Sequence, residues 1–156
     1  MQGDKQTSER MREQARRMLM HISPNADLQL VILKGHLLIE ERLRDIIEKR
    51  IRGHAALGMD DGSKWTFDHK ARLAEALCHG EEHDSLWRGV RKLNKIRNRL
   101  AHHVEPEGLS DMVDDLNRSW PGAPVLSRQN EYIRNTLCSM FIALYDLAER
   151  HDEDSG

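Results

Sequence analysis

Apolar residues recur along most of the chain at spacings of three and four positions, which is the period of an amphipathic α-helix. The clearest run covers residues 84–103, and its apolar positions are Leu86, Val90, Leu93, Ile96 and Leu100. A second long run begins at the helix-start signal Ser23-Pro24 and continues to about Arg52. The pattern therefore predicts helices as the main elements.

Four weaker patterns complete the chain. Residues 4–20 predict a peripheral helix rich in Arg and Glu, and Thr66 is placed to cap a helix from Phe67 to about His79 that Gly80 ends. Two further helices are predicted over residues 109–117 and 128–151, with an acidic, disordered tail over residues 152–156. We expect an all-α, up-and-down bundle of four to five main helices forming one domain over residues 1–156.

Composition narrows the class of protein. Aromatic residues are 4% of the chain and charged residues 32%, a balance that favours a helical domain over a β-sandwich. The formal net charge is −2, so any site for a polyanion must be a local patch. The N-terminus lacks a signal-like apolar segment and no run approaches the length of a membrane span. With Cys78 and Cys138 expected as reduced thiols, we predict a cytoplasmic protein.

The polar side of the predicted helix over residues 84–103 is strongly basic. At ~100° per residue, five side chains lie opposite Leu93: Arg88, Arg91, Lys95, Arg99 and His102. Asn98 lies one turn before His102, so a phosphate-sized anion would meet cations, an amide and an imidazole there. Arg97 differs, because it lies only ~40° from Leu93 at the edge of the apolar stripe.

Two residues are unusual inside the long helix predicted to end near residue 52. Gly35 costs roughly 1 kcal/mol relative to alanine in a helix, which predicts a close approach of another helix there. Arg42 falls within the apolar stripe, where a cation needs an anionic partner or a route to solvent.

The segment Arg97-Asn98 followed by Leu100-Ala101-His102 resembles the arginine, polar residue, histidine signature of the HEPN superfamily of helical nucleotide-binding bundles. Residues 34–40, 67–76 and 86–102 are similar to a bacterial branch of that superfamily related to mannitol-repressor-like proteins. The resemblance implies a helical bundle that often dimerises. It also implies that Arg97 and His102 form a metal-independent ribonuclease site, although many members of the superfamily are non-catalytic.

The chemistry supports the same residues. Cleaving RNA without a metal needs a base, an acid and cations on the phosphate. Histidine suits proton transfer near pH 7, and arginine suits bidentate binding of phosphate. A two-fold dimer would bring two His102 and two Arg97 side chains to one groove, whereas His103 points elsewhere. Within one chain, positions five apart are ~140° apart on a helix. Arg97 and His102 can therefore face the same phosphate only if the helix bends or frays, or if the two side chains come from different chains of a dimer.

Structural alternatives remain open for each of these residues. Arg97 could cap a helix or form a buried ion pair with Glu40 or Glu41, and these carboxylates could instead assist the site or hold Arg42. His102 could be an ordinary histidine favoured by the helix dipole, and the basic run could be a solvated face. Four residues of the types that bind zinc are not spaced as in a standard zinc finger, so they are expected to be ordinary polar residues near helix ends: His69, Cys78, His79 and His83. The three tryptophans are expected in the core or at its boundary.

The leading hypothesis is therefore a metal-independent endoribonuclease, with a toxin or defence role, acting as a homodimer on RNA. Arg97 and His102 are its catalytic candidates, and the supporting residues are Asn98, His103, Glu40 and Glu41. We expect phosphate contacts from Arg88, Arg91, Lys95 and Arg99, no metal or cofactor, and a possible neutralising partner protein. The alternative is a non-catalytic regulatory or interaction module resembling the mannitol repressor.

Overall fold

The computed structural model describes residues 2–61, 64–78 and 83–154, and every regular element in these ranges is helical. In chain order they are α1 (Gln2–His21), α2 (Leu28–Arg50), the 3₁₀-helix η1 (His54–Leu57), α3 (Phe67–Leu77), α4 (Asp84–His102), α5 (Leu109–Ser119) and α6 (Gln129–Asp154). The all-α prediction is confirmed. These ranges contain six α-helices, however, where four to five main helices were expected. No helix within them has the length and apolar character needed to cross a membrane.

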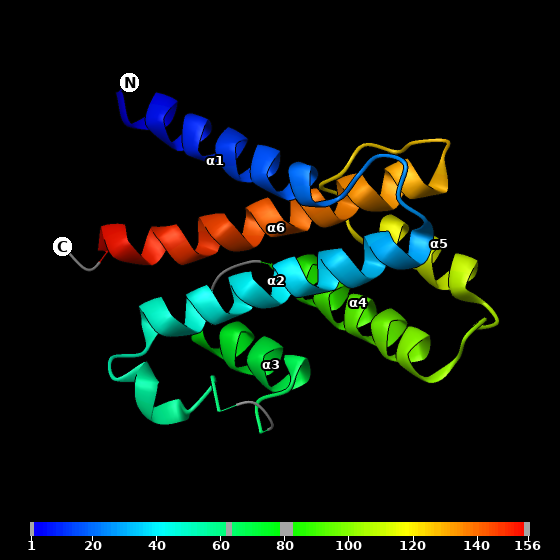
Figure 1. Cartoon of the computed structure of the whole chain (residues 1–156). Helices are drawn as coiled ribbons and strands as arrows, with labels where there is room; N and C mark the ends of the chain where they lie inside the picture. Colours follow the sequence, from blue (N-terminus) through cyan, green and yellow to red (C-terminus); the bar gives the residue numbers. More distant parts are fainter. Residues whose placement is uncertain (1, 62–63, 79–82, 155–156) are drawn as a thin grey trace.

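Helix α2 is the centre of the bundle. It packs against α6 on one side and against α3 and α4 on the other (Figure 1). Its buried apolar side chains follow the predicted stripe: Val31, Ile32, Ile39, Leu43 and Ile46. Gly35 lies where α2 approaches α6, and a Cβ atom at this position would overlap Leu137 Cδ1. The expected close helix–helix approach is therefore present.

The start of α2 differs from the prediction. Ser23-Pro24 does not begin the helix; instead Asp27 caps it, and its Oδ1 accepts a hydrogen bond from the Leu30 amide at 2.8 Å. Ser23 forms a separate turn in which its Oγ accepts from the Asn25 amide at 3.2 Å. Both residue types cap helices well, so local preference alone did not distinguish the two sites.

The C-terminal ends of α6 and α3 can also be compared with the predicted ends. Helix α6 extends to Asp154 and so includes the acidic residues 152–154 expected in a disordered tail. Charge disfavours burial but does not prevent a helix, and Glu is a good helix former. His79 and Gly80, expected at the end of α3, and residues 155–156 lie outside the described ranges.

Helix α1 is held mainly at its C-terminal end. Residues 3–10 are exposed, whereas Met18 and Ile22 are fully buried. The Arg134 guanidinium on α6 donates to the carbonyl oxygens of Ile22 (2.9 Å) and Leu19 (3.0 Å). These bonds satisfy carbonyls that the end of a helix leaves without intrahelical partners. The helix predicted over residues 4–20 corresponds to α1 (Gln2–His21).

Arg42 is buried in the apolar stripe of α2, as its position in the sequence indicated. Its guanidinium lies 5.0 Å from the centre of the Phe141 ring. It forms ion pairs with Asp45 at 3.0 Å and with Glu41 at 3.5 Å. The cation is therefore stabilised by an aromatic face and by carboxylates at the edge of the core.

Candidate functional site

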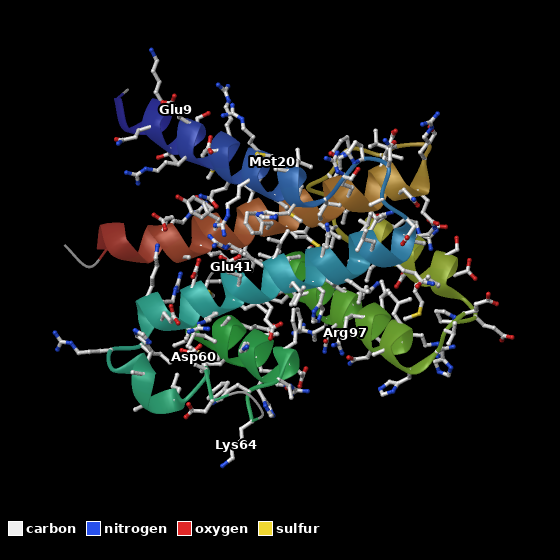
Figure 2. The ribbon with its side chains drawn as sticks, in the orientation of Figure 1. Glu9, Met20, Glu41, Asp60, Lys64 and Arg97 are labelled. Atoms are coloured by element: carbon white, nitrogen blue, oxygen red, sulfur yellow. The ribbon has the colours of Figure 1, made fainter. Side chains whose placement is uncertain are left out.

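A cleft of about 400 Å³ lies where α2, the first turn of α3 and α4 meet. It is lined by His36, Glu40, Thr66, Phe67, Asp68, Asn94, Arg97 and Asn98. Three residues singled out from the sequence, Glu40, Arg97 and Asn98, therefore lie in one cleft. Figure 2 shows the labelled Arg97 side chain beside α4, on the side where α2 and α3 lie.

Helical spacing explains how these side chains meet. His36 and Glu40 are four positions apart on α2, and Asn94 and Asn98 are four apart on α4, so each pair lies on one face of its helix. The first turn of α3 is held by a capping box in which the Thr66 hydroxyl accepts from the His69 amide at 3.3 Å. Three well-formed helical segments thus set the walls of the cleft.

His36 and Asn94 were not identified as site residues from the sequence. His36 is 5% exposed, and its ring stacks on Phe67 with the ring centres 4.0 Å apart. Its Nε2 lies 3.1 Å from Asn94 Oδ1. Burial lowers the pKa of His36, an effect that the Asn94 hydrogen bond and the Glu40 charge oppose and the Arg97 charge reinforces. The imidazole is therefore favoured in its neutral form.

Arg97 lines the cleft without forming an ion pair with any described carboxylate. Glu40 is instead paired with Lys70 at 2.9 Å, and Glu41 with Arg17 at 2.9 Å. The contact of Arg97 with Asn98 Oδ1 is 3.5 Å long and contributes little. The buried ion pair that the sequence left open for Arg97 is thus not formed with either glutamate. The guanidinium faces the cleft as an available cation.

His102 is exposed at the last turn of α4 and does not line this cleft. The helix remains regular up to this residue, and His103 follows it as the exposed, extended C-cap. No bending or fraying therefore compensates for the five-residue separation between Arg97 and His102. One chain by itself keeps these two side chains apart.

The basic face of α4 is exposed, as predicted, but part of its charge is already paired. Arg91 forms an ion pair with Glu75, and an Arg99 nitrogen donates to the Glu107 carbonyl at 3.4 Å. Arg88 and Lys95 are exposed and form no ion pair with the described residues. These two cations are the ones most available to a polyanion.

An exposed apolar stripe borders the cleft on α2. Leu33 and Leu37 are 40% and 65% exposed, and Leu30 continues the stripe at 39%. Leu33, Leu37 and Glu40 follow the i, i+4, i+7 spacing of one helix face, so the stripe leads directly to a carboxylate of the cleft. A partner that covered these leucines would lie against the cleft.

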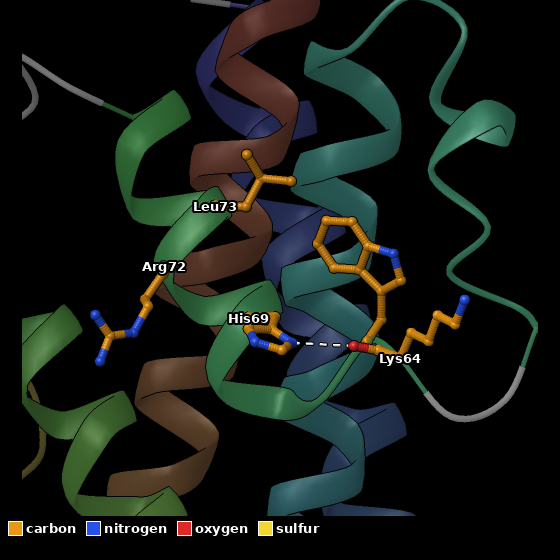
Figure 3. A pocket seen from close by; sticks show the side chains of 5 residues that line it. Lys64, His69, Arg72 and Leu73 are labelled. Carbon is orange, nitrogen blue, oxygen red and sulfur yellow. Dashed lines mark hydrogen bonds between the residues drawn. The ribbon is translucent and has the colours of Figure 1, made fainter.

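A second hollow of about 550 Å³ lies on the outer side of α3 and is mainly apolar (Figure 3). Its lining residues are Lys64, Trp65, His69, Arg72 and Leu73. The Trp65 indole donates to the Leu57 carbonyl at 2.6 Å, and His69 Nδ1 lies 3.1 Å from the Lys64 carbonyl oxygen. Trp65 is also partly buried against the hydrophobic core, which agrees with the boundary packing expected from the sequence. None of the predicted catalytic residues lies here.

No group of three His, Cys, Asp or Glu side chains in the described ranges is arranged to hold a metal ion. Comparison of the chain with models of protein families, with curated proteins and with solved structures gives no match. The resemblance to the HEPN superfamily therefore rests on the sequence of residues 34–40, 67–76 and 86–102, including the motif that ends at His102, and it stays a prediction.

Proposed function

We propose that this protein is a metal-independent endoribonuclease that cleaves RNA through attack by the 2′-hydroxyl group. The observation that carries the proposal is the cleft between α2, α3 and α4, which presents Arg97 without a carboxylate partner among the described residues. An unpaired guanidinium in a partly enclosed site favours a phosphate ligand, because it offers two parallel hydrogen bonds to the phosphate oxygens. Asn98 adds an amide at the same edge.

Cleavage also needs a group that protonates the leaving 5′-oxygen, and His102 has suitable chemistry for this step. Because His102 lies outside the cleft of its own chain, we propose that it acts in the cleft of a second copy. The exposed leucines beside the cleft support such a dimer, since a second copy covering Leu33 and Leu37 would remove apolar surface from water.

The oligomer is tested by light scattering at micromolar concentration, with Leu37→Glu as the disrupting variant. We expect a dimer for the unmodified protein and a monomer for Leu37→Glu, which places a charge in the apolar stripe. The matched control is Val125→Glu, because Val125 is an exposed apolar residue (83%) far along the chain from this stripe. A fully active monomer would contradict the shared site.

Catalysis is tested by incubating the purified protein with single-stranded RNA in EDTA. We expect a 2′,3′-cyclic phosphate and a 5′-hydroxyl at each cut, and no cleavage of DNA with the same base sequence, because DNA lacks the attacking oxygen. Arg97→Ala and His102→Ala should each abolish cleavage, whereas His103→Ala, at the neighbouring exposed position, should reduce it much less. Cleavage that persists in both inactive variants would identify a contaminating nuclease.

A toxin or defence role would follow from this activity. Expression of the active chain should then arrest growth, and expression of the Arg97→Ala variant should not.

The separation of Arg97 from His102 within one chain favours a second candidate, a non-catalytic regulatory or interaction module. In that case the cleft and the apolar stripe would bind a partner without cleaving it. RNA that stays intact with a clean, dimeric protein would support this alternative and reject the ribonuclease.

A further inference from the structure

The cleft contains one titratable ring that the scheme above does not use. We infer that His36 is the general base of the cleft and accepts the proton of the attacking 2′-hydroxyl group. This inference rests on the proposed ribonuclease activity and names a further catalytic residue for it. It also assigns the two proton transfers to different chains, with the base in the cleft of one copy and the acid from His102 of the other.

The hydrogen bond to Asn94 sets which ring nitrogen is basic. Asn94 Oδ1 lies 3.1 Å from His36 Nε2, and an amide oxygen only accepts hydrogen bonds. Nε2 therefore carries the hydrogen of the neutral ring, and Nδ1 carries the free electron pair. Phe67 stacks on the ring at 4.0 Å between centres with an angle of 24° between planes, which restricts its rotation. The ring is thus fixed in position and tautomer before a ligand enters.

The charges around His36 favour a base over an acid. Burial disfavours its protonated form, and the nearby Arg97 cation acts in the same direction. The Glu40 carboxylate opposes them, but it is already paired with Lys70 at 2.9 Å. The remaining charged group of the cleft, Asp68, is paired with Arg72 at 2.7 Å.

The proposed cleavage of RNA needs no metal ion and no oxidant or reductant. The 2′-hydroxyl gives its proton to His36 Nδ1 as its oxygen forms a bond to phosphorus. The bond between phosphorus and the 5′-oxygen breaks, and that oxygen takes a proton from His102 of the second copy. Arg97 holds the phosphate oxygens throughout. The products are a 2′,3′-cyclic phosphate and a 5′-hydroxyl, and a proton passing from His36 back to His102 through water completes the cycle.

The first test compares His36→Gln with His54→Gln, a histidine in η1 that does not line the cleft. Single-turnover cleavage of a 5′-labelled RNA in EDTA should fall about 100- to 10,000-fold in His36→Gln and stay unchanged in the control. An unchanged melting temperature shows that the loss is not one of folding. If His36→Gln cleaves at the unmodified rate, the inference is wrong while the proposed function stands. If the unmodified protein cleaves no RNA, the proposed function and this inference both fail.

A second variant keeps the test decisive if His36→Gln does not fold. Asn94→Asp places a carboxylate on Nε2, which raises the pKa of His36. The acidic limb of the plot of cleavage rate against pH should therefore move to higher pH, together with the His36 ring signals in an NMR titration. A limb that stays in place while the ring signals move would show that another group is the base.

Mixing variants tests the division between chains. His36→Gln and His102→Ala should each have little or no activity as homodimers. A mixed dimer has one cleft with His36 intact that receives His102 from the other chain, so mixing should restore part of the activity. No recovery after subunit exchange, confirmed by native mass spectrometry, would contradict the assignment of base and acid to different chains.

Discussion

Replacing Gly35 by alanine tests the contact that places α2, and with it His36, in the bundle. A Cβ atom at this position would overlap Leu137 Cδ1 and lie 3.3 Å from Leu137 Cγ. Carbon atoms pack at about 3.5–4.0 Å, so rotating one terminal methyl group does not relieve the clash. Leu137 is fully buried, so its short, branched side chain can yield only by disturbing its packed neighbours. The substitution must therefore push the two helices apart or force a strained rotamer.

Two opposing effects determine how much Gly35→Ala changes the free energy of unfolding. Overpacking a core costs about 1–3 kcal/mol. Alanine gains about 1 kcal/mol over glycine in a helix interior. We expect a net loss of about 1 kcal/mol, which for a domain of this size lowers the melting temperature by roughly 2–4 °C. Chemical denaturation followed by circular dichroism measures the change in the free energy of unfolding.

Gly89→Ala is the matched control. This glycine also lies in a helix, but its Cβ would meet the flexible end of Met140, with 3.1 Å to Cε and 3.4 Å to Sδ. The thioether can move aside, so the helix-propensity gain should prevail and Gly89→Ala should be at least as stable as the unmodified protein. If Gly35→Ala is equally stabilised, the close approach of α2 and α6 is refuted. In a double-mutant cycle, Leu137→Ala should lessen the cost of Gly35→Ala, because it removes the overlapping atoms.

Three further outcomes follow from individual contacts. Arg97→Ala should change the free energy of unfolding by less than about 1 kcal/mol in thermal denaturation, since no described carboxylate loses a partner; a loss of about 3–5 kcal/mol would indicate a buried ion pair. Burial lowers the pKa of folded His36 below its unfolded value, so the unfolded chain binds more protons between those two values. Stability should therefore decline as the pH falls below about 6.5, and His36→Gln should reduce this decline in denaturation curves at pH 7.5 and 5.5. Arg134→Met should leave the Leu19 and Ile22 carbonyls without their donor and speed hydrogen exchange at the end of α1, while exchange in α4 stays unchanged.

Local patterns in the sequence were sufficient to predict most of the helices. The apolar spacing over residues 84–103 predicted α4 almost to the residue, and Thr66 correctly marked the start of α3. These signals are short in range, because one helical turn involves only residues three and four apart. These local signals gave the wrong start for α2, where two candidate capping residues lie close together. Asp27, and not Ser23, caps this helix.

The site was predictable only in part, for a related reason. The position of Arg97 at the edge of an apolar stripe was readable from the spacing along α4, and so was its angular separation from His102. Its neighbours in the cleft were not. His36 and Asn94 are 58 positions apart, and a pair of polar residues on two different helices leaves no periodic trace in the sequence.

The periodicity of the sequence thus predicted the secondary structure and the basic face of α4, because both depend on the spacing of residues within one helix. Packing between helices decided that Glu40 pairs with Lys70 and leaves Arg97 available, and that His36 rather than His102 shares its cleft. These choices depend on how far apart the helices lie and how they cross. Those quantities come from the fit of many side chains at once, including the absence of one at Gly35.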